Sequence, residues 1–113
     1  GNPGAPGQCT WFTWWWRAND PRSLGKLPGG LSHARYWATT SSVTARFRVD
    51  HTPEVGAVFQ TANGSWYGHV GVVTAINGDG TITVREMNYL NRAFTVFESI
   101  IPANSVGNFF YIH

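Results

Sequence analysis

Residues 66–88 have the sequence WYGHVGVVTAINGDGTITVREMN, which predicts a β-hairpin. Two runs rich in valine, isoleucine and threonine, 66–76 and 81–88, flank the segment Asn77-Gly78-Asp79-Gly80. Asparagine or aspartate followed by glycine, placed between alternating runs, is a strong signal for a tight turn between antiparallel strands. An antiparallel sheet is therefore the expected framework of the fold.

The simplest register of this hairpin pairs Asn77 with Gly80 and gives one face an apolar end and a polar end. Directly opposed side chains share a face, and the pairs nearest the turn are Val73 with Val84 and Ala75 with Ile82. Farther from the turn the same face carries His69, Gly71, Glu86 and Asn88. A slip of one residue would move the last two to the other face, and the apolar pairs favour the register without the slip.

The segment 9–18, CTWFTWWWRA, predicts a helix that is almost entirely buried. Its polar positions are spaced three and four residues apart and form one narrow stripe: Thr10, Thr13 and Arg17. Aromatic side chains cover the rest, and those expected in the core are Trp11, Trp14 and Trp15. We expect this helix to pack on the apolar face of the hairpin, which brings the polar end of that face near Cys9 in the first helical turn.

The remaining segments predict an α+β architecture. A second short helix is expected over 32–40, with Ser32 as its N-cap. Further strands are expected at 43–49, 55–60, 94–99 and 108–112. Two helices followed by such strands predict helices packed on an antiparallel sheet of about five or six strands.

Length and composition limit the classes of protein that are compatible with this sequence. A chain of 113 residues fits one domain. The net charge of +2 comes with scattered arginines, so the chain lacks the concentrated basic surface of a nucleic-acid-binding protein. No apolar run is long enough to cross a membrane, and no His, Cys, Asp or Glu cluster has the spacing of metal ligands. The single cysteine cannot form an internal disulfide, so its thiol is available for chemistry.

The chemistry indicated by these residues is nucleophilic attack by a thiolate. The pKa of a free cysteine falls at a helix N-terminus or beside an imidazolium, and both surroundings are predicted for Cys9. His69 is placed to take the thiol proton and later to protonate a leaving amine, while Glu86 or Asn88 orients its ring. The Gln8 side chain and the N–H of Cys9 are the natural donors to an oxyanion. The opposing interpretation is that Cys9 is an inert thiol among tryptophans, which is common for free cysteine.

Four motifs in this order resemble the CHAP family, the cysteine, histidine-dependent amidohydrolases/peptidases of bacterial and phage cell-wall lysis. They are GQCTWF (7–12), TPEVGAV (52–58), YGHVGVV (67–73) and DGTITVREMNY (79–89). The resemblance runs from about residue 7 to residue 113. It implies a papain-like fold with Cys9 as nucleophile, His69 as base and Glu86 as third residue, with Asn88 and Gln8 at further positions of the site. The segment GNPGAPGQ has no carboxylate, so the calcium site of some relatives is not expected.

The resemblance implies a peptidoglycan hydrolase that needs no cofactor. Its bond is either the N-acetylmuramoyl-L-alanine amide or an amide within the stem or cross-bridge peptides. We expect residues 1–113 to be one catalytic domain, monomeric when isolated and cut from a longer extracellular or phage-delivered parent, with 1–6 as a linker remnant. The alternatives are an aromatic wall-binding module without catalysis, and a cysteine amidase or peptidase with a substrate outside the wall.

Four aromatic side chains are candidate contacts for a substrate. Trp16 lies near the Cys9 side of the predicted helix. The others are Trp37, Trp66 and Tyr67, for which packing in the core or at its rim is an equal alternative.

Overall fold

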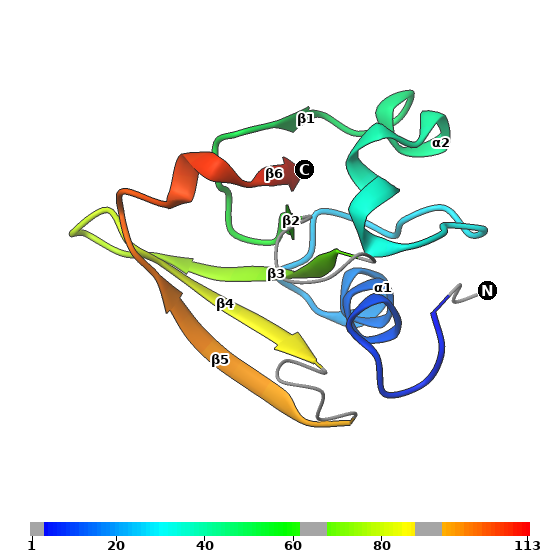
Figure 1. Ribbon diagram of the computed structural model, residues 1–113, viewed down its shortest axis with the longest axis horizontal. Coiled ribbons are helices and arrows are strands. Elements are labelled where there is room, and N and C mark those ends of the chain that lie inside the picture. Colours follow the sequence, from blue (N-terminus) through cyan, green and yellow to red (C-terminus); the bar gives the residue numbers. More distant parts are fainter. Residues whose placement is uncertain (1–3, 62–67, 88–93) are drawn as a thin grey trace.

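The computed structural model describes residues 4–61, 68–87 and 94–113 and shows the expected α+β architecture (Figure 1). The helical elements are α1 (Cys9–Asn19), the 3₁₀ helix η1 (Ala34–Thr39), the short α2 (Ser41–Thr44) and the 3₁₀ turn η3 (Val106–Asn108). The strands are β1 (Val49–Asp50), β2 (Val58–Thr61), β3 (His69–Ile76), β4 (Ile82–Met87), β5 (Val96–Ile101) and β6 (Phe110–Ile112). They form one antiparallel sheet in the order β1-β6-β2-β3-β4-β5.

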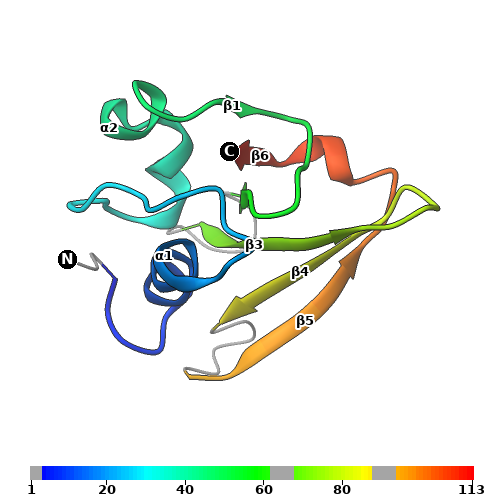
Figure 2. The same ribbon diagram turned by 180° about the vertical axis from the view of Figure 1, so that it is seen from behind.

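Helix α1 lies across β3 and β4, while η1 packs on β2 (Figures 1 and 2). Phe12 and Trp16 of α1 pack against Val72 and Met87. A second cluster joins Trp14 to η1 and to three strands through Trp37, Val58, Val70 and Ile112. The expectation that α1 packs on the face of Val73 and Val84 is therefore wrong, because the residues that α1 contacts, Val72 and Met87, point to the opposite face of the sheet.

The face that carries Val73 and Val84 is covered by the segment between β5 and β6 instead. This segment passes through η3 and returns across the sheet close to the tip of the β3–β4 hairpin (Figures 1 and 2). Its apolar side chains Val106 and Phe109, with Ile101 at the end of β5, pack against a cluster that contains Phe59, Val73, Ile82, Val84 and Tyr111. The two faces of the sheet thus have separate covers.

The β3–β4 hairpin has the expected register at its far end, but its turn is one residue longer than the simplest register predicts. The Asn77 N–H donates to the Thr81 carbonyl at 2.9 Å, so the loop has three residues instead of two, and Ala75 is opposite Thr83 instead of Ile82. A bulge at Thr74 then removes the offset, and Val73 is opposite Val84, as predicted. Because the register is restored before the far end, the side chains of His69 and Glu86 lie on the same face.

Two other expectations for the fold are wrong. Residues 43–49 do not form a strand, since the segment 41–44 is helical and β1 has two residues only. Val43 is fully buried in the cluster under η1, so tertiary packing overrides its preference for a strand. The second is the N-cap: the expected short helix is present as the 3₁₀ helix η1, but its N-cap is His33 instead of Ser32. A buried glutamine holds η1 to β2, since Gln60 accepts from the Ala38 N–H at 2.6 Å and donates to the Arg35 carbonyl at 2.9 Å.

The polar stripe of α1 faces inward. Thr13 and Arg17 are 0% and 1% exposed, whereas Trp15, expected in the core, is 48% exposed. The Arg17 guanidinium determines this orientation, because it donates to the carbonyls of Gly25, Ile112 and His113 at 2.7, 2.9 and 3.1 Å. Within the described residues, no helix has both the length and the apolar character needed to cross a bilayer.

Candidate active site

Cys9 is the first residue of α1, and the backbone before it determines where its N–H points. Gln8 is the N-cap with extended backbone (φ −98°, ψ 165°), and its carbonyl accepts from the Phe12 N–H at 3.1 Å. The Gln8 carbonyl and the Cys9 N–H belong to one trans peptide plane and point in opposite directions. The Cys9 N–H therefore points out of the N-terminus of the helix, where the first N–H groups have no intrahelical acceptor.

His69 and Glu86 form a short, largely buried ion pair at one end of the sheet. The His69 Nε2 lies 2.7 Å from the Glu86 Oε2, and the two side chains are 18% and 7% exposed. Gly71 allows the Phe59 ring of β2 to pack directly on the backbone of β3, since a Cβ at this position would meet that ring and lie 2.7 Å from the Arg85 carbonyl oxygen. The second oxygen of Glu86 accepts from the Ser99 hydroxyl at 3.4 Å.

The Cys9 thiol and the His69 ring share a hydrogen bond. Because Nε2 of the ring is directed to Glu86, Nδ1 is the nitrogen that remains for the sulfur. The sulfur also accepts hydrogen bonds from the N–H groups of Val70 and Thr10. The site is thus a linear chain of groups from sulfur to imidazole to carboxylate, in which α1 supplies the first group and β3 and β4 supply the others.

This chain of contacts shifts both pKa values. Burial raises the pKa of Cys9, but the hydrogen bond and charge of His69, with the two backbone donors, outweigh burial and leave the pKa below its ordinary value. Burial lowers the pKa of His69, but the hydrogen bonds and charges of Cys9 and Glu86 raise it to about 9. The two groups titrate as a pair, and the pair favours thiolate beside imidazolium over the neutral forms.

A cleft of about 320 Å³ adjoins the imidazole and the carboxylate on the face of the sheet away from α1. Its apolar walls include Phe59, Val84, Ile101 and Phe109, and its polar groups include Thr61, His69, Glu86 and Ser99. The cleft gives solvent access to the carboxylate side of the pair. Among the described residues, no group of three or more His, Cys, Asp or Glu side chains is arranged to hold a metal ion.

The sequence-predicted site residues fall into three groups. Cys9, His69 and Glu86 come together where α1 begins beside β3 and β4, and Gln8 precedes Cys9 as the N-cap of α1. Trp16 and Trp37, predicted as candidate substrate contacts, are 2% and 0% exposed and belong to the core, because α1 and η1 turn them toward the sheet. Asn88, Trp66 and Tyr67 lie outside the described residues.

Ser99 is a member of the site that the sequence analysis missed. It lies in β5 opposite Val84, and Phe97 lies opposite Glu86 on the same face. The alternation of β5 gives the signal that could have found Ser99, but only once the pairing of β4 with β5 is known.

Replacing Glu86 by glutamine tests the electrostatic part of this arrangement. The amide keeps an acceptor for the His69 ring but removes the negative charge, so the pKa of His69 should fall and the pKa of Cys9 should rise. We expect alkylation of Cys9 by iodoacetamide at neutral pH to slow by about 10-fold, with its pH midpoint moved to higher pH. Rates measured across the pH range check this.

The matched control for that experiment is Glu98→Gln, which removes the charge of an exposed glutamate in β5 opposite Arg85. This variant should retain the alkylation profile of the parent protein. Equal profiles for Glu86→Gln and the parent would show that the carboxylate does not sustain the ion pair.

Comparisons with known proteins show the family of this chain. The family model of the CHAP domain matches residues 1–88. The Probable autolysin LDP of Staphylococcus aureus (strain NCTC 8325 / PS 47) is 49% identical over 113 residues, which is 100% of this chain and 38% of that protein. The Staphylococcal secretory antigen SsaA of the same strain is 36% identical over 107 residues, which is 95% of this chain and 39% of that protein.

A solved structure shows the same fold. The crystal structure of an N-acetylmuramoyl-L-alanine amidase from Staphylococcus aureus matches with a TM-score of 0.81 and 27% identity, over 95% of this chain and 30% of that chain. The chain thus spans less than two fifths of the length of these relatives. Since the family model covers residues 1–88, which is most of the chain, this chain belongs to the CHAP domain family.

Proposed function

We propose that this domain hydrolyses amide bonds of bacterial peptidoglycan, with Cys9 as the nucleophile. The observation that carries the proposal is the contact chain from the Cys9 sulfur through His69 to Glu86, with the 2.7 Å ion pair at its buried end. A thiolate held beside an imidazolium is a nucleophile with an acid already in place. The pKa directions of both groups support this protonation state.

In this mechanism the Cys9 thiolate attacks the amide carbon and a tetrahedral intermediate forms. The carbonyl oxygen becomes an oxyanion, and the outward-pointing Cys9 N–H and the Gln8 side chain are the proposed donors to it. The His69 imidazolium gives its proton to the leaving amine, the carbon–nitrogen bond breaks, and a thioester remains. Glu86 keeps the ring oriented and stabilises its positive charge throughout.

Water then completes the cycle. The neutral His69 imidazole takes one proton from water as the hydroxide equivalent attacks the thioester carbon. The carbon–sulfur bond breaks, and the thiolate and imidazolium are restored. The product leaves as a carboxylic acid, which gives its remaining proton to the solvent and becomes a carboxylate. The reaction involves no redox step. One amide and one water give one amine and one carboxylate.

The substrate class is supported by the names of the relatives. One is called an autolysin, another a secretory antigen, and the structural neighbour an N-acetylmuramoyl-L-alanine amidase. These names favour a domain that acts outside the cytoplasm, on cell-wall amides. The bond that is cut is either the amide between the muramoyl lactyl group and L-alanine, or an amide within the stem or cross-bridge peptides.

Analysis of the products tests the proposal and distinguishes the two bonds. Purified cell walls are incubated with the domain, and the released fragments are analysed by mass spectrometry and by labelling of new amines. Cleavage at the lactyl amide gives free L-alanine amino ends and sugars with a free lactyl carboxylate. Cleavage within the peptides gives new ends there and leaves the lactyl amide intact.

The control for this experiment is the same domain alkylated at its single cysteine with iodoacetamide. We expect new ends from the untreated domain and none from the alkylated one. Walls that bind the domain but yield no new ends would contradict the proposal and favour a wall-binding module. New ends that appear equally with the alkylated domain would exclude Cys9 as the nucleophile.

A further inference from the structure

Phe94 has an unusual backbone conformation for a bulky residue. Its φ is 62°, and within the described residues no other residue except glycine has a positive φ. A side chain with a Cβ is disfavoured in this region by roughly 1–2 kcal/mol, so the surrounding contacts must hold the conformation. The ring is nevertheless 66% exposed, so burial of the ring does not account for the strain.

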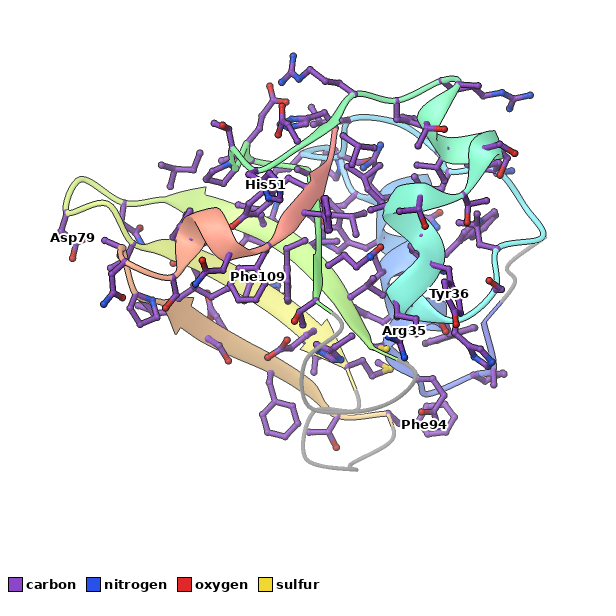
Figure 3. All side chains as sticks on the ribbon, turned by 45° about the horizontal axis from the view of Figure 1, so that its top comes forward. Arg35, Tyr36, His51, Asp79, Phe94 and Phe109 are labelled. Carbon is purple, nitrogen blue, oxygen red and sulfur yellow. The ribbon has the colours of Figure 1, made fainter. Side chains whose placement is uncertain are left out.

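The contacts that Phe94 makes are with the segment that precedes Cys9. Its N–H donates to the Gly7 carbonyl at 3.0 Å. Its ring lies so close to the Gly7 backbone that a Cβ at Gly7, where φ is +86°, would lie 2.6 Å from a ring carbon. The ring also meets Trp11 of α1 edge to face, with 6.3 Å between the ring centroids. Figure 3 shows Phe94 beside the amino-terminal segment that leads into α1.

Phe94 thereby fixes one peptide plane close to the nucleophile. The plane between Gly7 and Gln8 is held at its oxygen by the Phe94 N–H and at its nitrogen by the Ala5 carbonyl, at 3.2 Å. The next plane, between Gln8 and Cys9, is held at its oxygen by the Phe12 N–H. The N–H of this second plane is the one that points out of the helix toward the proposed oxyanion.

We infer that Phe94 is a positioning residue, which orients the Cys9 N–H and the Gln8 side chain through Gly7. The inference rests on the proposed thiolate mechanism and adds to it a residue from the segment that leads into β5. The strained backbone of Phe94 is retained because relaxation would release the Gly7 carbonyl and the ring that presses on Gly7. The contacts of Phe94 described above are to Gly7 and Trp11, so we expect its effect to be confined to steps that develop an oxyanion.

Two small reagents separate this role from a structural one. Acylation of Cys9 by 4-nitrophenyl acetate passes through a tetrahedral oxyanion, whereas alkylation by iodoacetamide displaces iodide and forms no oxyanion. Both reactions need the thiolate. In Phe94→Gly, which removes the ring and tolerates the positive φ, we expect acylation to slow by about 10-fold and alkylation to change by less than about two-fold. The Phe94→Tyr variant keeps the ring and should keep both rates.

The matched control is Phe110→Ala, which removes another exposed aromatic ring from β6 and should leave both rates unchanged. Parallel loss of acylation and alkylation in Phe94→Gly would overturn the inference, because it indicates a general effect on the fold or the thiolate. Unchanged acylation would overturn it as well. Since neither reagent is peptidoglycan, wild-type protein that acylates rapidly but releases nothing from walls would count against the proposed function and not against the role of Phe94.

Discussion

Replacing Cys9 by alanine is expected to lower the release of new ends from cell walls by at least about 10⁴-fold. The substitution removes the sulfur that attacks the amide carbon, and the described site offers no second nucleophile beside His69. The measurement is the initial rate at which free amines or carboxylates appear from purified walls. The Cys9→Ser variant should be similarly inactive, because a hydroxyl beside this histidine is ionised far less readily than a thiol.

Two measurements test whether Cys9→Ala loses activity merely because it fails to fold. The Cys9→Ala protein should bind walls and unfold in urea much as the parent does, since Cys9 is only half-buried and alanine is a good helix former. The matched control is Ser42→Ala, an exposed change in α2 that should retain full hydrolysis. Hydrolysis by a folded Cys9→Ala variant at a rate near that of the control would refute the mechanism.

Replacing Arg17 by alanine is expected to lower the free energy of unfolding by about 3–5 kcal/mol. The guanidinium is buried, and burial lowers its pKa to about 10, so it is still cationic at neutral pH. It satisfies three carbonyls, those of Gly25, Ile112 and His113, and its loss leaves these groups without a donor beside a cavity. Equilibrium unfolding in urea measures the change.

The comparison for Arg17 is Arg46→Ala, which removes an exposed arginine from the segment after α2. We expect a change below about 0.5 kcal/mol there. If Arg17→Ala were no less stable than Arg46→Ala, the three hydrogen bonds would contribute little, and α1 would be held to β6 by its tryptophans alone.

The positions of the site residues could be predicted from the sequence more reliably than the packing of the helices and loops around them. The alternation of β3 and β4 and the turn between them predict that His69 and Glu86 share a face, and the 2.7 Å pair confirms this. Side chains at neighbouring positions of two paired strands come together through the alternation of each strand and the register between them, and both can be predicted from the sequence of the hairpin. The start of α1 at Cys9 follows from local signals of the same kind.

The face on which α1 packs was not predictable from the hairpin alone. The choice depends on what the rest of the chain brings to each face: Trp37 and Ile112 build the apolar surface under α1, whereas Phe109 and Val106 close the other side. Helix 41–44 and the inward orientation of Arg17 depend on long-range partners in the same way. Phe94 offered no signal at all, because its role appears only when Gly7 is beside it.

The bulge at Thr74 also matters for how this hairpin can change during evolution. One additional residue in the turn shifts every pair below it, and in most two-stranded ribbons the error would reach the far end. Here the bulge at Thr74 removes the offset midway along the hairpin. The register at the end with His69 and Glu86 is therefore the one that a two-residue turn would give. The three-residue turn and the bulge at Thr74 are therefore linked: deleting Thr74 alone would carry the offset to the far end and separate the imidazole from the carboxylate.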